Sequence, residues 1–116
     1  MNRRLTGTYY EQVAAQYLME NGYDILERNY RCCFGEIDLI ARQGSYLVFI
    51  EVKFRKDRKM GYPQESVHRA KQRRIYQTAV QYITFHHLPY NTPCRFDVVS
   101  ILGETITLIP NAFGGF

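Results

Sequence analysis

The sequence predicts an α/β fold in which a mixed sheet of about five strands is flanked by two main helices. Residues 35–53 read as a β-hairpin, because two runs rich in aliphatic, β-branched and aromatic residues flank the turn residues 43–45. Helical periodicity and three further apolar runs predict the other elements, which lie at about 8–21, 23–29, 64–87, 95–102 and 105–109. The order helix, three strands, helix, two strands gives an α/β sandwich with the hairpin in the middle of the sheet.

The first helix is predicted to begin at Thr8. Thr8 and Glu11 have the spacing of a capping box, in which a glutamate reaches back to the helix N-terminus. Asn21-Gly22 ends the helical pattern. Glu11 is therefore assigned a capping role on spacing alone. The strand at 23–29 follows, and residues 30–34 are expected to form a loop.

The second strand of the hairpin carries two charges at its end. Residues 46–52 are almost continuously apolar, which is typical of a central strand covered on both faces. Glu51 and Lys53 then share one face. A hairpin loop of two residues, Gln43-Gly44, or of four, Arg42 to Ser45, places Asp38 opposite Phe49 and makes Glu51 its diagonal neighbour, roughly 7–8 Å away. A three-residue loop without a bulge would put the two acids on opposite faces.

These residues have the chemistry of a divalent-metal site. Mg²⁺, or Mn²⁺ in its place, prefers hard oxygen ligands, which Asp38, Glu51 and the carbonyl of Val52 could supply. Lys53 could orient a water or stabilise charge growing on a phosphate, so the set suits phosphodiester hydrolysis. The competing interpretation has equal weight on the residues alone: Glu51 and Lys53 form an ion pair at a strand end and Asp38 lies in a turn.

Basic residues follow the hairpin and continue along the second helix. They are compatible with phosphate contacts, and equally with a solvated surface for any one residue. The candidate nucleic-acid-binding residues are Arg55, Arg58, Lys59, Arg69, Lys71, Arg73 and Arg74. Glu36 faces the same side as Asp38 in a regular strand, so it could support the metal ligands as a neighbouring acid or simply be solvated, and we favour the solvated state.

Composition limits the class of protein. A chain of 116 residues is long enough for one hydrophobic core, and its longest apolar run is too short to span a membrane. Three cysteines without zinc spacing predict reduced thiols. No apolar segment follows the basic start, so we expect a cytoplasmic protein. The net charge of +4 is compatible with a polyanionic partner.

Four motifs together resemble the YraN-type family of small bacterial proteins: Gly-Glu-Ile-Asp-Leu-Ile-Ala at 35–41, Val-Phe-Ile-Glu-Val-Lys-Phe-Arg at 48–55, the Ser66 to Ile75 segment, and Arg-Phe-Asp-Val-Val at 95–99. That family is regarded as predicted endonucleases of the restriction-endonuclease-like fold, similar to archaeal Holliday-junction resolvases. The resemblance implies one nuclease-like domain over 1–116, with Glu11 joining the metal site and Lys71 matching the family pattern. Asp97 also belongs to the pattern, and we interpret it as structural.

Two functions follow from these expectations. The first is a metal-dependent endonuclease that acts on DNA of branched or irregular structure. The alternative is a nuclease-fold protein that binds nucleic acid or a partner protein without cleaving. The aromatic residues of the C-terminal tail are expected to cover a sheet edge or to meet a second subunit in a homodimer.

Overall fold

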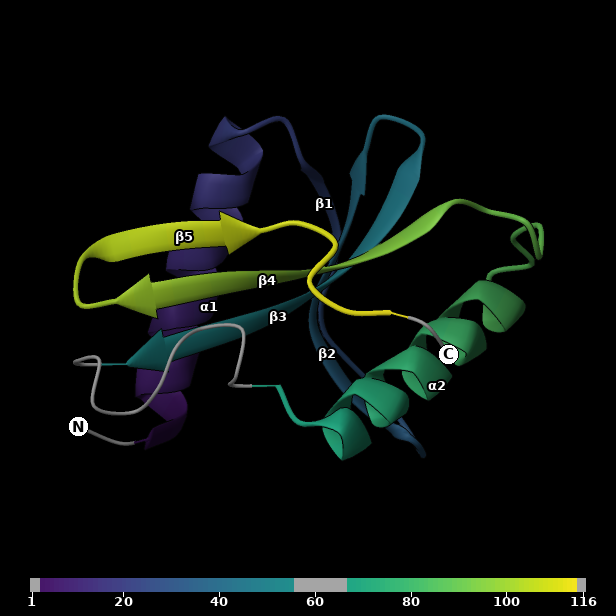
Figure 1. Ribbon diagram of the computed structural model, residues 1–116, viewed down its shortest axis with the longest axis horizontal. Helices are drawn as coiled ribbons and strands as arrows, with labels where there is room; N and C mark the ends of the chain where they lie inside the picture. The colour runs from purple at the N-terminus through teal and green to yellow at the C-terminus, as the bar shows by residue number, and fades with distance from the viewer. Residues whose placement is uncertain (1–2, 56–66, 115–116) are drawn as a thin grey trace.

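The computed structural model describes residues 3–55 and 67–114. It contains five strands and two helices (Figure 1), in the order α1 (Arg3–Glu20), β1 (Asp24–Cys32), β2 (Gly35–Gln43), β3 (Tyr46–Arg55), α2 (Arg69–Phe85), β4 (Cys94–Leu102) and β5 (Thr105–Ile109). The predicted fold class, an α/β sandwich with a mixed sheet between two main helices, is confirmed. Neither helix in this part of the chain has the length and apolar character needed to cross a membrane.

The five strands form one sheet in sequence order, β1-β2-β3-β4-β5. Neighbouring strands are antiparallel except for β3 and β4, which are parallel. A parallel pair needs a crossover connection, and α2 lies in the segment that makes it. The hairpin of β2 and β3 therefore occupies the middle of the sheet, as the sequence predicts.

The two helices cover opposite faces of the sheet, and in Figure 1 the strands pass in front of α1 while α2 lies in front of β2. The side chains of a strand alternate between faces, so β3 contributes to both layers of the core. The layer under α1 contains Ala14, Leu18, Leu39, Val48, Ile50 and Val99 among its buried residues. The layer under α2 contains Ile40, Leu47, Phe49, Ile75, Tyr82 and Val98.

The register of the central hairpin differs from the predicted one. Gln43 pairs with Tyr46, so the loop is Gly44-Ser45 and Gly44 takes a positive φ of 58°. The predicted pairing of Asp38 with Phe49 is wrong by two residues. A shift of two residues does not by itself exchange the faces of a strand, and Asp38 and Glu51 line one cleft.

Three predicted boundaries are also wrong. Helix α1 begins at Arg3, so Glu11 lies inside the helix and the capping-box interpretation is excluded. Helix α2 begins at Arg69 after the extended N-cap residue His68, so His68 is not helical as predicted, and the predicted start at Gln64 lies outside the described residues. Strand β1 continues to Cys32, so most of the loop predicted at 30–34 is strand. Pairing with β2 extends β1 beyond its local sequence pattern.

A buried polar network holds β4 to its surroundings. The Asp97 carboxylate is fully buried and accepts two hydrogen bonds from the Arg95 guanidinium, each 2.9 Å long. It accepts two more from the Tyr23 hydroxyl and the Asn111 backbone N–H, also at 2.9 Å. Burial, reinforced by Asp97, raises the pKa of Tyr23 to about 12. The contacts agree with the structural role predicted for Asp97.

Candidate active site

The site lies where the two central strands separate. The ladder between β2 and β3 extends from Gln43–Tyr46 to Leu39–Ile50. Beyond that point β2 stays paired with β1 while β3 stays paired with β4, and Figure 1 shows the two strands diverging. Asp38 occupies the fork: its Oδ2 accepts a 2.8 Å hydrogen bond from the backbone N–H of Val52. A side-chain oxygen thus takes the place of the next ladder carbonyl.

A cleft of about 360 Å³ opens at this fork between the two helices. It is lined by Gly7, Glu11, Asp38, Glu51, Val52, Lys53, Phe54, Arg55 and Lys71. The cleft therefore gathers all four predicted catalytic residues, together with Val52, from α1, β2 and β3. Helix α2 adds Lys71, which comes from the opposite face of the sheet to α1.

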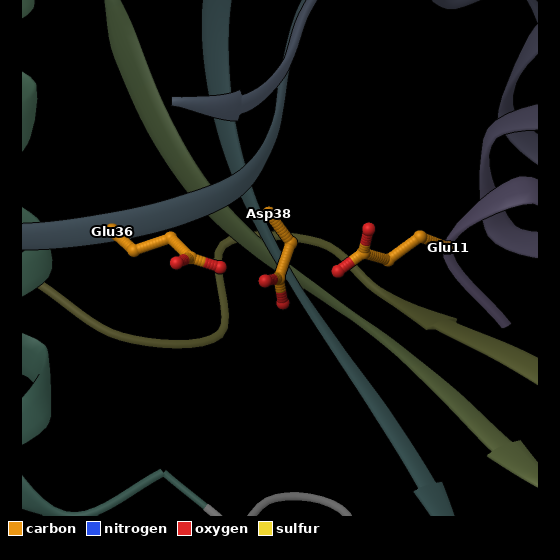
Figure 2. Close-up of side chains that lie close together, drawn as sticks. All are labelled: Glu11, Glu36 and Asp38. Atoms are coloured by element: carbon orange, nitrogen blue, oxygen red, sulfur yellow. The ribbon is translucent and has the colours of Figure 1, made fainter. Parts of the chain in front are cut away.

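Three carboxylates converge at the edge of the cleft, two from its lining and Glu36 from beside it. Oxygen atoms of Glu11, Glu36 and Asp38 lie within 4.8 Å of one another. Figure 2 shows Glu11 reaching from α1 and Glu36 from β2, each with its carboxylate turned toward Asp38. Burial and the nearby Glu51 and Glu11 charges raise the pKa of Asp38 to about 8. Without a bound cation, burial and mutual repulsion therefore disfavour the charged forms of these carboxylates.

The three acids fit a divalent metal. In an octahedral site with Mg²⁺–oxygen distances of about 2.1 Å, neighbouring ligand oxygens lie about 3.0 Å apart and opposite ones about 4.2 Å apart. Oxygens within 4.8 Å of one another therefore need to approach by up to about 2 Å, a movement within the range of side-chain rotation. Hard carboxylate donors from Glu11, Glu36 and Asp38 are also the ligand type that Mg²⁺ and Mn²⁺ prefer.

Glu51 has a different environment from the other acids. Its side chain is 6% exposed, and Lys71 Nζ contacts its Oε1 at 2.6 Å. Lys53 Nζ lies 3.8 Å from the same oxygen. The ion pair expected between Glu51 and Lys53 is thus present but long, and Lys71 is the closer partner. Burial lowers the pKa of Lys71, but the charge of Glu51 and the hydrogen bond to it, together with smaller contributions from Lys53 and Asp38, raise the pKa by more, so the net shift is upward.

Of the two lysines in the cleft, Lys53 lies farther from Glu51. Its side chain is about one quarter exposed. Burial and the positive charge of Lys71 lower its pKa, despite the attraction of Glu51. An ammonium group with a lowered pKa gives up its proton more readily and is less strongly solvated than a surface lysine.

Strand β1 supports the acid cluster from its other side. Asn29 has a positive φ of 53° within the strand, and the ladder to β2 skips the Asn29–Asp38 position. The Asn29 side chain hydrogen-bonds Glu11, which opposes the rise in the pKa of Glu11 that burial causes. Asn29, Arg31 and Glu36 line a second hollow of about 520 Å³ that shares Gly7 and Glu11 with the cleft.

The predicted basic residues are not all brought together. Arg55 and Lys71 line the cleft. Arg69, Arg73 and Arg74 are exposed on the first turns of α2 and do not line it. Arg58 and Lys59 lie outside the described residues.

Three features of the site were not predicted from the sequence. Glu36 was expected to be solvated, yet its carboxylate joins the cluster and also pairs with Arg31 at 2.7 Å. Its position two residues before Asp38 is the signal that could have identified it. Asn29 and the pairing of Lys71 with Glu51 have no such signal, because both depend on contacts between segments distant in sequence.

Comparisons with known proteins place the chain in a family. The model of the family described as "Uncharacterised protein family UPF0102" matches residues 10–101. A UPF0102 protein of Lachnoclostridium phytofermentans is 53% identical over 116 residues, which cover all of this chain and 98% of that protein. One of Syntrophus aciditrophicus is 50% identical over 93% of this chain and 87% of the relative.

A third relative, from Caldicellulosiruptor saccharolyticus, is 41% identical over 97% of this chain and its own full length. All three carry the same family designation. Together with the four motifs at Gly35–Ala41, Val48–Arg55, Ser66–Ile75 and Arg95–Val99, these matches confirm the resemblance noted from the sequence. The chain belongs to the UPF0102 family, the YraN-type proteins.

Proposed function

We propose that the protein is a metal-dependent endonuclease that hydrolyses phosphodiester bonds in DNA, with branched or irregular DNA as its substrate. The observation that carries the proposal is the combination, in one cleft, of convergent carboxylates with a loosely paired lysine. Hydrolysis of a phosphodiester needs an activated water and stabilisation of the negative charge that grows on the phosphate. The cleft offers groups suited to both tasks.

The acids are the proposed metal ligands. Asp38 is central, because it lies between Glu11 and Glu36 (Figure 2) and shares the cleft with Glu51. When bound, the ion would lower the pKa of a water and neutralise phosphate oxygens. The hydrogen bond from Val52 N–H fixes one Asp38 oxygen and so orients the other.

Lys53 is the proposed catalytic cation. Its ammonium lies at the cleft and its nearest carboxylate contact is 3.8 Å long, so it has donor capacity to spare for a phosphate oxygen. Lys71, by contrast, is engaged at 2.6 Å and is suited to holding Glu51 in place. Arg55 adds a positive charge at the same opening, where a nucleic-acid backbone would arrive.

One observation favours the non-cleaving alternative. Glu51 is already neutralised by Lys71, which would suit a cleft preserved for structure. A cleavage assay on linear, forked and four-way DNA with Mg²⁺ or Mn²⁺ separates the two functions. The nuclease proposal predicts metal-dependent product on at least one of these DNAs. Salt-sensitive binding of all of them without any product would support the binding protein instead.

Calorimetry with Mn²⁺ tests the ligand set without DNA. Glu36→Gln and Asp38→Asn should each weaken Mn²⁺ binding at least 10-fold if their carboxylates are ligands. Glu104→Gln, on the exposed turn between β4 and β5, removes the same charge away from the site and is the matched control. If both Glu36→Gln and Asp38→Asn bind Mn²⁺ with the parental affinity, these two carboxylates are not metal ligands.

A further inference from the structure

A second feature of the molecule lies away from the active-site cleft. Helix α2 has an apolar groove of about 490 Å³ on its outer flank, closed on one side by Phe34 from the turn between β1 and β2. The groove is lined by Phe34, Tyr76, Gln77, Val80, Gln81, Thr84 and Phe85, and none of these residues is charged. Val80 is 44% exposed, Phe34 44% and Phe85 70%.

Charge is distributed unevenly along α2. The first six residues, 69–74, include four cations, whereas residues 75–85 include no charged side chain. A soluble helix normally keeps charged residues on its exposed face along its whole length. The uncharged and partly apolar outer face of the second half of α2 therefore indicates a contact surface.

We propose that this groove is the interface of a homodimer, in which α2 packs antiparallel against α2 of a second copy around a two-fold axis. Arg73, Gln77, Val80 and Thr84 follow one another at i, i+4, i+7 and i+11, which places them on one side of the helix. Such a stripe can contact its own copy, because an isologous interface uses the same patch on both subunits.

The antiparallel direction follows from charge. A parallel pair would set the cationic first turns of two α2 helices side by side. An antiparallel pair brings Arg73 of one copy next to the last turn of the partner's α2, where the helix dipole is negative. With the axis between Gln77 and Val80, the two cationic ends lie on the order of 20 Å apart, at a rise of 1.5 Å per residue.

The area of this surface predicts a weak dimer. At roughly 200 Å² per aromatic residue, the exposed parts of Phe34 and Phe85 contribute on the order of 200 Å² of ring surface per copy. Val80 and the polar residues Gln77, Gln81 and Thr84 add to this area. Because the aromatic contribution is well below the ~800 Å² per partner of a standard interface, we expect a dimer that dissociates within the micromolar range.

Sedimentation velocity between 1 and 500 µM tests the proposal without DNA or metal, so its outcome is independent of the nuclease proposal. The parent should shift from 13.7 kDa toward twice that mass as concentration rises. Val80→Glu should stay at 13.7 kDa, because it places a charge in both halves of a symmetric interface. Met19→Glu, a 43% exposed position on α1, is the matched control and should dimerise like the parent.

Phe34→Ser provides a second test at a turn, where misfolding of α2 is not a concern, and it should weaken the dimer at least 10-fold. A parent that remains at 13.7 kDa over the whole range overturns the proposal and leaves the groove to a different protein. A dimer that survives both Val80→Glu and Phe34→Ser at parental strength would place the interface elsewhere.

Discussion

Replacing the two lysines of the cleft one at a time should affect different properties of the protein. Lys71 Nζ is 2.6 Å from Glu51 Oε1 and Lys53 Nζ is 3.8 Å from it. Lys53→Ala should therefore act mainly on the reaction, whereas Lys71→Met should act mainly on the folded state. The comparison is sharp because both changes remove one positive charge from the same cleft.

The expected size of the Lys71 effect follows from burial. Breaking a buried ion pair costs about 3–5 kcal/mol and breaking an exposed one about 0–1 kcal/mol. Glu51 is almost fully buried, while the Lys71 side chain is about one third exposed, so we expect a loss of about 1–3 kcal/mol. At about 2.1 cal/mol/K of unfolding entropy per residue, 116 residues correspond to about 4 °C per kcal/mol. The Tm should fall by about 4–12 °C.

The expected size of the Lys53 effect follows from catalysis. Loss of one preorganised donor to a developing negative charge typically lowers the rate about 10²-fold or more. If Lys53 acts only in the transition state, DNA affinity should change little. Its long contact with Glu51 predicts a change in stability below about 1 kcal/mol.

Both variants should be measured by thermal unfolding and by single-turnover cleavage of a DNA that the parent cleaves. Arg42→Ala, an exposed cation on β2 that does not line the cleft, controls for net charge. A folded Lys53→Ala protein that cleaves as fast as the parent would refute the catalytic role. A Lys71→Met protein with the parental Tm would refute the larger contribution to stability that we assign to the shorter ion pair.

Three further predictions concern the acids and their supports. The pKa of Asp38 is raised from an ordinary value near 4 to about 8, so the metal-free protein should lose stability as pH rises between these values. Asp38→Asn should therefore raise the Tm of metal-free protein more at pH 8 than at pH 5, and an equal gain at both pH values would contradict this. Asp97→Asn breaks a fully buried, four-bond network and should lower stability by about 3–5 kcal/mol, measured by urea unfolding; a loss under about 1 kcal/mol would count against the network. Asn29→Gly keeps the positive φ but removes the amide that bonds Glu11, so Mn²⁺ affinity should fall several-fold in calorimetry. Asn111→Gly, at a φ of 52° in the C-terminal segment, is its control, and equal affinities in the two variants would exclude a role for the amide.

The order of elements and the common face of Glu51 and Lys53 could be predicted because both follow from local periodicity. Alternation along β3 assigns these two residues to one side of the strand, and both line the cleft. The exact register could not be predicted in this way, since Gln43, Gly44 and Ser45 all suit a turn and only the pairing of whole strands selects Gly44-Ser45.

The wider site depends on contacts that local patterns do not contain. Glu11 has the spacing of a capping acid, but the helix continues to Arg3 and so frees its carboxylate to face Asp38. Lys71 is 20 residues from Glu51 and meets it only because α2 crosses over the sheet. The sequence therefore predicts which chemical groups are present, whereas the crossover and the strand pairing decide which of them meet.

The fork between β2 and β3 also bears on aggregation. Where the ladder ends at Leu39 and Ile50, each strand turns one edge toward the opening, and such an edge can template a strand from another chain. Charged side chains on this part of the strands, among them Asp38 and Lys53, make the opening a poor template because a foreign strand would bury their charges unpaired. The residues proposed for catalysis thus also disfavour pairing of another chain with the unpaired strand edges in the middle of the sheet. Variants that carry neutral substitutions there should also be measured by light scattering, because one change can cause both a loss of activity and self-association.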